Sequence, residues 1–237
     1  MIDDVRLNEG LTQLGFRLGT VERGKFATFA GILHEESGKL NLTRVPKEQY
    51  VERHFLDSLS MGSGFFNGAS TLLDVGSGAG FPGIPIAISC PDLQVVLLEA
   101  TGKRVSFLRS VASACALGNL EVLQGRAEEL AHDQCYREKF DRVVARAVAR
   151  LITLAELTIP YAKVGGLLAY QKGEEAKVEY AEAAAVITEL GGQLSEVRAL
   201  QPHKHLIVLS KVEGTPNDRP TSYARMKQRE ERIVSKQ

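Results

Sequence analysis

The sequence predicts an α/β protein with a seven-stranded, mostly parallel sheet and an N-terminal helical extension. From Thr71 onward, short apolar runs alternate with helical stretches, which is the pattern of βαβ units. Before Thr71 the apolar residues recur at helical spacing instead. The first apolar run leads straight into a glycine-rich loop, as in strand-to-helix turns that bind nucleotides. A chain of 237 residues can bury one sizeable core, so we expect one α/β domain with appendages.

The first 68 residues are expected to be helical. One apolar stripe at helical spacing consists of Phe26, Phe29, Ala30 and Leu33. We expect this helix to end near Gly38 and a second helix to begin after Pro46. The buried side of the second helix would carry Val51, Phe55 and Leu59. Residues 1–68 are therefore assigned to an N-terminal helical extension.

Seven strands and their connecting helices can be placed in the rest of the chain. We predict strands near residues 71–75, 94–99, 120–124, 141–145, 166–171, 193–199 and 205–211. The helix between the second and third strands is expected to stop at Gly118-Asn119, and an alanine-rich helix to span 174–190. Residues 69–212 would form the core, followed by a basic tail over 213–237. This tail is poor in apolar residues, and we expect it to be partly disordered.

The composition excludes several classes of protein. The 29 Lys and Arg residues balance 29 Asp and Glu residues, which excludes a uniformly basic nucleic-acid coat but not one basic face. No apolar run approaches the roughly 18 residues of a membrane span, and no apolar leader follows Met1. We therefore expect a cytoplasmic monomer with no membrane partner. Cys90, Cys115 and Cys135 are too widely spaced to indicate a disulfide framework or a metal site.

The glycine-rich loop is the most informative segment of the chain. It reads Leu73-Asp74-Val75-Gly76-Ser77-Gly78-Ala79-Gly80-Phe81-Pro82-Gly83. Its last three glycines satisfy the dinucleotide fingerprint, so a nicotinamide cofactor has to be considered. Two features favour S-adenosylmethionine (SAM) instead. Asp74 lies two residues before the first glycine, and Pro82 interrupts the helix turn that would face a pyrophosphate, a group that SAM lacks.

Further candidate residues follow the next three strands. Glu99 ends the second strand about 20 residues beyond the loop, where its carboxylate could accept hydrogen bonds from both ribose hydroxyls. This spacing is shared by NAD and SAM sites, and the alternative is a solvated strand end. Arg126-Ala127-Glu128 follows the third strand, either beside an adenine or as a helix N-terminal turn. Arg146 ends the fourth strand, at the carboxyl edge of the sheet.

Seven segments between residues 40 and 211 together resemble a known family. They are Asn41-Leu42-Thr43, His54-x-x-Asp57-Ser58-Leu59, Leu73 to Pro85, Lys103-Arg104-x-x-Phe107-Leu108, Arg126-Ala127-Glu128, Ala145-Arg146-Ala147 and Lys172-Gly173. On these segments the chain is similar to the bacterial 16S ribosomal RNA methyltransferase G family, also called glucose-inhibited division protein B. The run Phe81-Pro82-Gly83-Ile84-Pro85 is more specific than the glycine loop itself. The tail departs from the usual basic, proline-rich ending of that family.

The resemblance implies a fold, an activity and a set of binding residues. The fold would be that of a Rossmann-like class I SAM-dependent methyltransferase, which methylates N7 of guanine 527 in 16S rRNA by direct methyl transfer. The partner would be 16S rRNA or the small ribosomal subunit. The cofactor contacts would be Gly76, Gly78, Phe81, Glu99, Ala100, Thr101, Ala127, Glu128 and Arg146. The substrate contacts would be Arg126, Arg146 and Lys172.

The reaction that the resemblance implies explains why no catalytic side chain stands out. Guanine N7 has an in-plane lone pair and no proton to lose, so methyl transfer needs alignment more than a general base. The chain lacks an Asn/Asp-Pro-Pro-aromatic motif and a Pro-Cys nucleophile after the fourth strand. Two other functions stay open, an NAD-dependent oxidoreductase and a non-enzymatic rRNA-binding assembly factor. For His54 and Asp57, a cap over the cofactor and a hydrogen bond between helix and core are both open.

Overall fold

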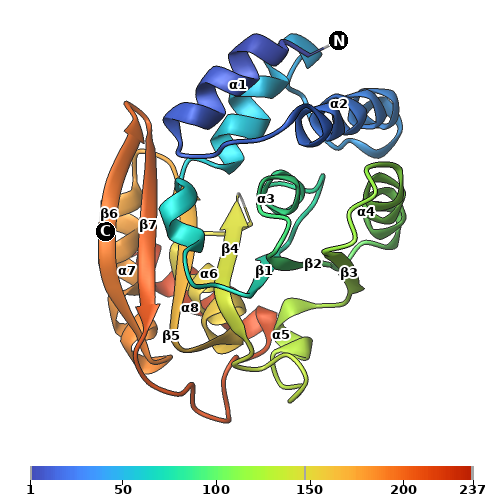
Figure 1. The fold of residues 1–237 in the computed structure, drawn as a ribbon. Helices are drawn as coiled ribbons and strands as arrows, with labels where there is room; N and C mark the ends of the chain where they lie inside the picture. The colour runs from blue at the N-terminus through green and yellow to red at the C-terminus, as the bar shows by residue number, and fades with distance from the viewer. Residues whose placement is uncertain (1, 147, 236–237) are drawn as a thin grey trace. The chain divides into compact units, whose positions relative to one another are not determined.

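A computed structural model describes residues 2–146 and 148–235 of the chain (Figure 1). Its strands are β1 (Thr71–Val75), β2 (Gln94–Glu99), β3 (Leu120–Gln124), β4 (Phe140–Arg146), β5 (Ala162–Lys172), β6 (Gly192–Gln201) and β7 (Lys204–Lys211). Its α-helices are α1 (Asp4–Gln13), α2 (Thr20–Leu40), α3 (Gly83–Ser89), α4 (Gly102–Ala114), α5 (Ala127–Leu130), α6 (Leu151–Thr158), α7 (Ala176–Glu189) and α8 (Tyr223–Val234). The seven predicted strands are all present.

The strands form one mixed sheet in the order β3-β2-β1-β4-β5-β7-β6. β2 pairs with β3, β1 with β4 and β4 with β5, in each case in parallel. Only β7 and β6 run antiparallel to their neighbours, because a short turn joins them as a hairpin. The prediction of an α/β fold with a seven-stranded, mostly parallel sheet is confirmed. Among the described residues, no helix is both long and apolar enough to cross a membrane.

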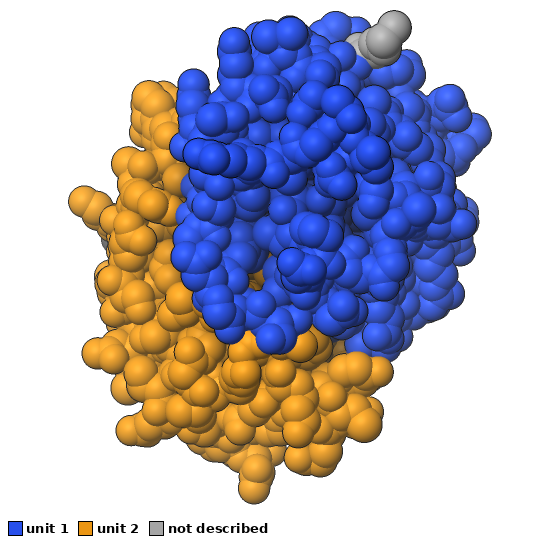
Figure 2. All heavy atoms as spheres, viewed as in Figure 1, with its two compact units in different colours: residues 1–70, 77–124 blue, residues 71–76, 125–237 orange. Residues whose placement is uncertain are grey.

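The described chain divides into two compact units, coloured separately in Figure 2. Unit 1 comprises residues 1–70 and 77–124, and unit 2 comprises residues 71–76 and 125–237. Each unit is treated by itself below. The division of the chain into a helical extension, a core and a tail stays a prediction.

Unit 1 joins the N-terminal helices to α3, α4, β2 and β3. The predicted stripe of α2 is fully buried, and α2 packs against both α3 and α4 (Figure 1). The expected end of this helix near Gly38 is confirmed to within two residues, because α2 ends at Leu40. It ends where Asn41 adopts the left-handed conformation, with φ of 51°.

Two other helix predictions for unit 1 need correction. The segment after Pro46 begins with a 3₁₀ turn at Lys47–Gln49 and a π-helical turn at Val51–Leu56, although it buries the predicted side chains. The helix α4 ends at Ala114, before Gly118. Asn119 has a different task, because its amide donates to the carbonyl oxygens of Ala87, Cys90 and Leu93 at 3.0, 3.1 and 3.0 Å.

Unit 2 contains β1, β4, β5, β7 and β6 with the helices α5 to α8. β4 lies between β1 and β5 in parallel register, so the carboxyl ends of these three strands meet at one edge. The helix α6 is buried along its whole length and packs against α7 and α8 (Figure 1). The alanine-rich helix α7 spans Ala176–Glu189 and is followed by Gly191 with φ of 80°, close to the predicted range.

The expectation of a partly disordered tail is wrong for its described residues. Residues 223–234 form α8, and polar side chains of the core hold the segment before it. Arg137, which is 8% exposed, donates to the carbonyl oxygens of Ala131, Arg219, Thr215 and Pro216 at 2.8 to 3.0 Å. Because these contacts are polar, the low apolar content of the tail did not reveal them. Residues 236 and 237 of the predicted tail lie outside the described residues.

Candidate active site

The glycine loop has the backbone that the sequence pattern predicts. Gly78 and Gly80 in unit 1 have φ of 57° and 90°, and Gly76 in unit 2 has φ of 71°. Residues other than glycine rarely adopt such backbone angles. The loop is closed by hydrogen bonds from Gly80 N and Phe81 N to Ser77 O at 2.7 and 3.1 Å. This turn leads directly into α3, and Gly80 is buried against Ile84 and Leu108, whereas Gly78 is half-buried.

Glu99 is buried at the carboxyl end of β2 and binds the loop. Its Oε2 accepts a hydrogen bond from Gly78 N at 3.0 Å, and its Oε1 accepts one from Thr101 N at 2.8 Å. The side chain is 6% exposed, and Arg104 Nη1 lies 3.9 Å from Oε2. Glu99 is therefore not a solvated strand end. Its carboxylate orders the glycine loop and the start of α4, a task that the spacing argument did not include.

Phe81 packs toward the N-terminal segment within unit 1. Its ring stacks on the His54 ring with a centroid distance of 4.4 Å and an interplanar angle of 17°, and both residues are buried. His54 Nε2 lies 2.7 Å from Thr43 Oγ1. This contact joins His54 to the segment after α2, and the two roles that the sequence analysis left open for His54 and Asp57 stay predictions. Ala100 and Thr101, both exposed, follow Glu99, and Thr101 is the N-cap residue of α4.

In unit 2, Asp74, Gly76 and Arg146 lie at the carboxyl ends of β1 and β4. Asp74 is fully buried and pairs in register with Val144 of β4. Gly76 follows β1, and a Cβ atom there would lie 2.9 Å from Val148 Cγ2. Arg146 is the last residue of β4, opposite Gln171 of β5, and is half-buried. The alanine after it, Ala147, lies outside the described residues.

The segment Arg126-Ala127-Glu128 forms a helix N-terminal turn. Arg126 is exposed and is the N-cap residue of α5, which begins at Ala127. The Ala127 carbonyl accepts a hydrogen bond from the Tyr161 hydroxyl at 2.6 Å. Burial raises the pKa of that hydroxyl, and the neighbouring charge of Glu128 raises it further. The helix turn is confirmed, whereas an adenine contact at this turn stays a prediction.

Lys172, at the end of β5, is engaged by protein groups. Its Nζ lies 2.7 Å from Glu179 Oε2 and donates to Ala149 O at 2.6 Å. The other contact of this Glu179 oxygen is Leu151 N, at 2.7 Å, the first residue of α6. The side chains of Lys172 and Glu179 are 9% and 12% exposed. A direct RNA contact by Lys172 stays a prediction, but it would compete with this ion pair.

Glu179 was missed by the sequence analysis. It lies on α7 one turn before Glu182, whose carboxylate receives two hydrogen bonds from Arg150 at 3.0 and 2.8 Å. The signal was a pair of acids three residues apart in an otherwise alanine-rich helix. Carboxylates whose side chains are mostly withdrawn from water, as here, require cationic or hydrogen-bonding partners. Here the partners are Lys172 and Arg150, which come from the ends of β5 and α6.

Solved structures with this fold include methyltransferases. Cofactor-bound Rv0187 from MTB matches with a TM-score of 0.57 and 18% identity, over 79% of this chain and 91% of that one. A mutant of the 16S rRNA (adenine(1408)-N(1))-methyltransferase from Catenulisporales acidiphilia matches with a TM-score of 0.52 and 16% identity, over 62% and 87%. Fold and strand order are those of a Rossmann-like class I SAM-dependent methyltransferase.

Comparison with protein sequences then identifies the family. A profile of GidB, described as rRNA small subunit methyltransferase G, matches residues 22–207. The ribosomal RNA small subunit methyltransferase G of Lactobacillus johnsonii is 40% identical over 219 residues, 89% of this chain and 92% of that protein. The protein of the same name from Lachnoclostridium phytofermentans is 40% identical over 227 residues, 93% and 94% of the two chains. The chain belongs to the rRNA small subunit methyltransferase G family. The NAD-dependent alternative is not favoured.

Proposed function

We propose that this chain transfers a methyl group from SAM to N7 of guanine 527 in 16S rRNA. Membership of the rRNA small subunit methyltransferase G family supports the substrate class. The resemblance carried by the glycine loop and the six other segments supports the atom and the position. The structural observation that carries the cofactor assignment is the buried Glu99 carboxylate, hydrogen-bonded to the loop that it follows in the chain.

The residues of unit 1 fit the sugar of SAM. Each Glu99 oxygen accepts one backbone N–H, so each keeps a second lone pair for a ribose hydroxyl. Gly78, which donates to this carboxylate, is half-buried and adds no side chain beside it. Gly76, Phe81, Ala100 and Thr101 complete the contacts that we propose along the loop and after β2. The proposed assignment of Ala127, Glu128 and Arg146 to the same cofactor rests on the family resemblance alone.

The chemistry asks little of the side chains. When bound, SAM supplies an electrophilic methyl group on a positively charged sulfur. Guanine N7 needs no deprotonation, so the protein has to hold the base in line with that methyl group, and positioning of this kind can supply roughly 7 to 11 kcal/mol. An unpaired base in an RNA loop can be presented without breaking a duplex. We propose that Arg126 and Arg146 contact the RNA.

Nucleoside mass spectrometry tests the proposal. The purified protein is incubated with SAM and with 16S rRNA or 30S subunits from a strain that lacks the endogenous enzyme, and 7-methylguanosine is then quantified and mapped. We expect one new 7-methylguanosine at position 527. Binding of the RNA without methylation would favour an assembly factor. In parallel calorimetry we expect SAM and its demethylated product to bind and NAD not to bind.

A further inference from the structure

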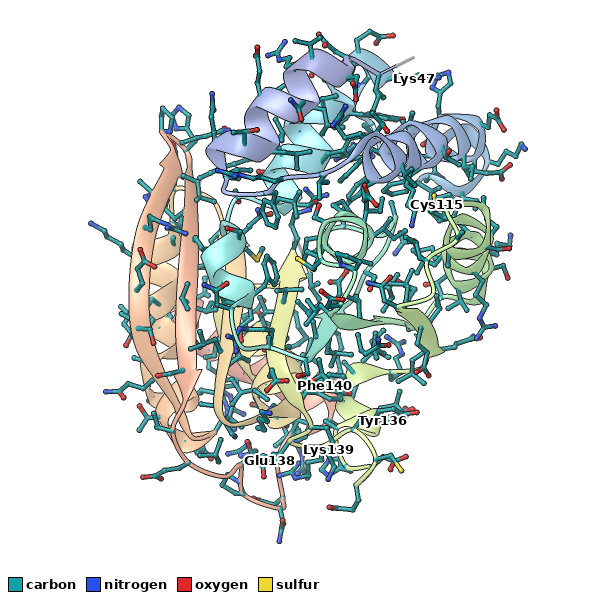
Figure 3. All side chains as sticks on the ribbon, in the orientation of Figure 1. Lys47, Cys115, Tyr136, Glu138, Lys139 and Phe140 are labelled. Atoms are coloured by element: carbon teal, nitrogen blue, oxygen red, sulfur yellow. The ribbon has the colours of Figure 1, made fainter. Side chains whose placement is uncertain are left out.

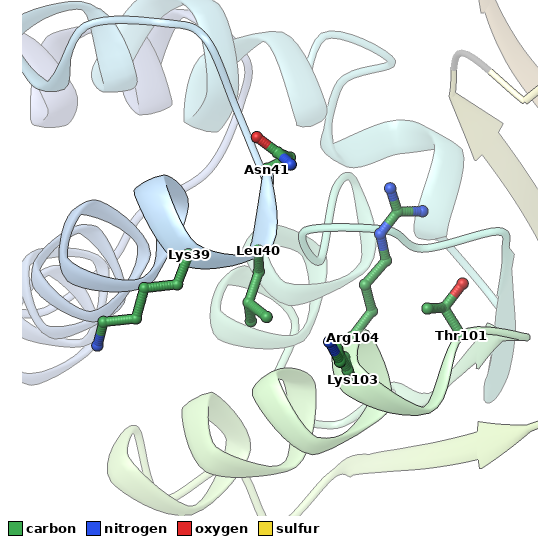
Figure 4. A pocket seen from close by; sticks show the side chains of 6 residues that line it. All are labelled: Lys39, Leu40, Asn41, Thr101, Lys103 and Arg104. Carbon is green, nitrogen blue, oxygen red and sulfur yellow. The ribbon is translucent and has the colours of Figure 1, made fainter.

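Unit 1 contains a hollow of about 360 Å³ whose lining differs, except at Thr101, from the residues that we propose to bind the cofactor. It is lined by Lys39, Leu40, Asn41, Thr101, Lys103 and Arg104 (Figure 4). The first three come from the end of α2, and the last three from the start of α4. Apart from Thr101, the cofactor proposal uses none of these residues.

Cations dominate this hollow. Its lining contains three basic side chains and no acid. Figure 4 shows the Arg104 guanidinium extending from α4 on the side of Asn41, whereas Lys39 extends away from the other labelled residues. Among the residues that the structure describes, the one acid paired with Arg104 is Glu99, at a long 3.9 Å, and the Arg104 side chain is 42% exposed. Lys103 is exposed and has no ion-pair partner among the described residues. Lys103 and Arg104, which are adjacent in the sequence, therefore bring two weakly compensated positive charges to this hollow.

The hollow continues along α4. A second hollow of about 370 Å³ is lined by Glu36, Leu40, Lys103, Ser106, Phe107 and Ser110, so the two share Leu40 and Lys103. A small free anion would occupy one hollow. An extended polyanion could follow both, with Lys103 at their junction. We define the basic groove as the surface formed by the lining residues of these two hollows. Its acid, Glu36, forms an ion pair with Lys39 at 2.8 Å, which leaves Lys103 and Arg104 as the cations available to a ligand.

We propose that the basic groove binds the phosphodiester backbone of the RNA substrate, with Lys103 and Arg104 contacting phosphate and the Asn41 amide donating to phosphate or sugar oxygen. This inference rests on the proposed function for the identity of the RNA. Its physical basis is charge: an RNA strand carries one negative charge per nucleotide, and neutralising phosphates releases counterions. Arg104 lies next to Glu99, so the groove begins beside the acid that we assign to the cofactor ribose.

Salt-dependent binding of the full-length protein to a 16S rRNA fragment tests this role. The informative variants are Lys103→Ala and Asn41→Gly. Glycine keeps the left-handed conformation of position 41, which ends α2, while it removes the amide. Lys177→Ala is the matched control, because Lys177 is an exposed lysine of α7 outside the groove.

We expect Lys103→Ala to reduce the slope of log K against log salt concentration by about 0.7, the value for one contact with a single strand. A Lys103→Glu/Arg104→Glu variant should weaken RNA binding at least tenfold. Asn41→Gly should weaken it severalfold without changing the slope, and Lys177→Ala should do neither. The affinity of Lys103→Ala for SAM should equal that of the wild type.

Other results would overturn the inference. A slope and affinity for Lys103→Ala equal to those of Lys177→Ala would remove the groove from the RNA interface. Competition by polyglutamate but not by RNA would assign the groove to an acidic protein. The proposed function is tested separately, because the salt slope measures binding and not methylation. It fails if the wild-type protein produces no 7-methylguanosine.

Discussion

Glu99 and Gly78 are joined by a hydrogen bond of 3.0 Å from the backbone of the loop to the buried carboxylate at the end of β2. The two residues lie 21 positions apart in the chain. The bond gives the acid a structural task in addition to the ribose contact that we propose. The loop and the carboxylate that we propose to bind the sugar are therefore held together by a direct bond.

Glu99→Ala should weaken SAM binding by roughly 1.5 to 3 kcal/mol, the range for a hydrogen bond to a charged group. Glu99→Gln keeps the shape and one acceptor oxygen, so it should lose less. Titration calorimetry with SAM measures both, and thermal unfolding without ligand reports the loss of the Gly78 bond separately. If both variants bind SAM as tightly as the wild type, Glu99 is not part of the site.

Gly80→Ala should destabilise the protein by about 1 to 3 kcal/mol, because φ of 90° is strained for any residue with a side chain. The added Cβ would also collide with Ile84 and lie 3.2 Å from Leu108 Cδ2. Gly118→Ala is the control, since no atom lies within 4 Å of a Cβ there and its φ is not positive. Urea unfolding compares the two variants. Equal stability would mean that the loop tolerates a different backbone.

Lys172→Ala should destabilise the fold, because it leaves Glu179 buried without its cation. Breaking a buried ion pair from one side typically costs about 3 to 5 kcal/mol. The partner variant Glu179→Gln and the double variant complete a mutant cycle, and urea unfolding should give a coupling between the two sites. If Lys172→Ala instead retains full stability but methylates RNA slowly, the lysine acts on the RNA directly.

The strands were predictable because each follows from a local apolar pattern. Residues 71–75 and 94–99 are observed as predicted, and the glycine loop has its positive φ angles where the pattern put glycines. The acid at the end of β2 was predicted by its spacing. The spacing could not predict the hydrogen bond from Gly78 to Glu99, because that bond depends on how the glycine loop folds back toward the end of β2.

The error about the tail comes from contacts made far along the chain. The order of the tail depends on Arg137 and Glu156, which lie more than 60 residues away from the tail groups they bind. The ion pair of Lys172 with Glu179 was likewise visible only once β5 and α7 were placed together, and the RNA contact of Lys172 stays a prediction.

Lys211 should make stability rise with pH in the mildly alkaline range. Burial lowers the pKa of its ammonium from 10.5 to about 8, although Glu138, labelled in Figure 3, opposes this shift and Arg137 adds to it. The group is fully buried and contacts Leu190 O, Thr215 and Glu138. Between pH 8 and 10.5 the folded state has released a proton that the unfolded state keeps, so folding is increasingly favoured as the pH rises.

Urea unfolding of wild type and Lys211→Met between pH 7 and 10 measures this effect. The unfolding free energy of the wild type minus that of Lys211→Met should rise with pH, by at most about 3 kcal/mol over the whole window. Cys90, with a pKa raised by burial to about 12, and Cys115, raised to about 11, are present in both proteins and cancel in the difference. A difference that does not vary with pH would mean that Lys211 keeps its ordinary pKa.

Glu156 should decide whether the tail stays in place. Its side chain is 1% exposed, and its oxygens accept hydrogen bonds from Thr221 N, Thr221 Oγ1 and Arg229 Nη1 at 3.0, 2.9 and 2.7 Å. Arg219 adds an ion pair at 3.6 Å. Because the carboxylate is on α6 and its partners above are in the tail, Glu156→Ala removes one polar anchor of the tail. The apolar contact of Met226 and the buried hydrogen bond from the Thr153 hydroxyl to Glu230 of α8 remain.

For Glu156→Ala we expect faster limited proteolysis within residues 213–235 and faster amide exchange in α8. Arg219 and Arg229 keep Glu189 as a partner, so the loss of stability should be about 1 to 3 kcal/mol, from the Thr221 donors left without their acceptor. Glu231→Ala, on the exposed side of the same helix, is the control and should change neither. Mass spectrometry of the fragments locates the first cuts. If the first cuts in Glu156→Ala fall elsewhere in the chain, Met226 and the Thr153–Glu230 hydrogen bond suffice to hold α8 without the Glu156 carboxylate.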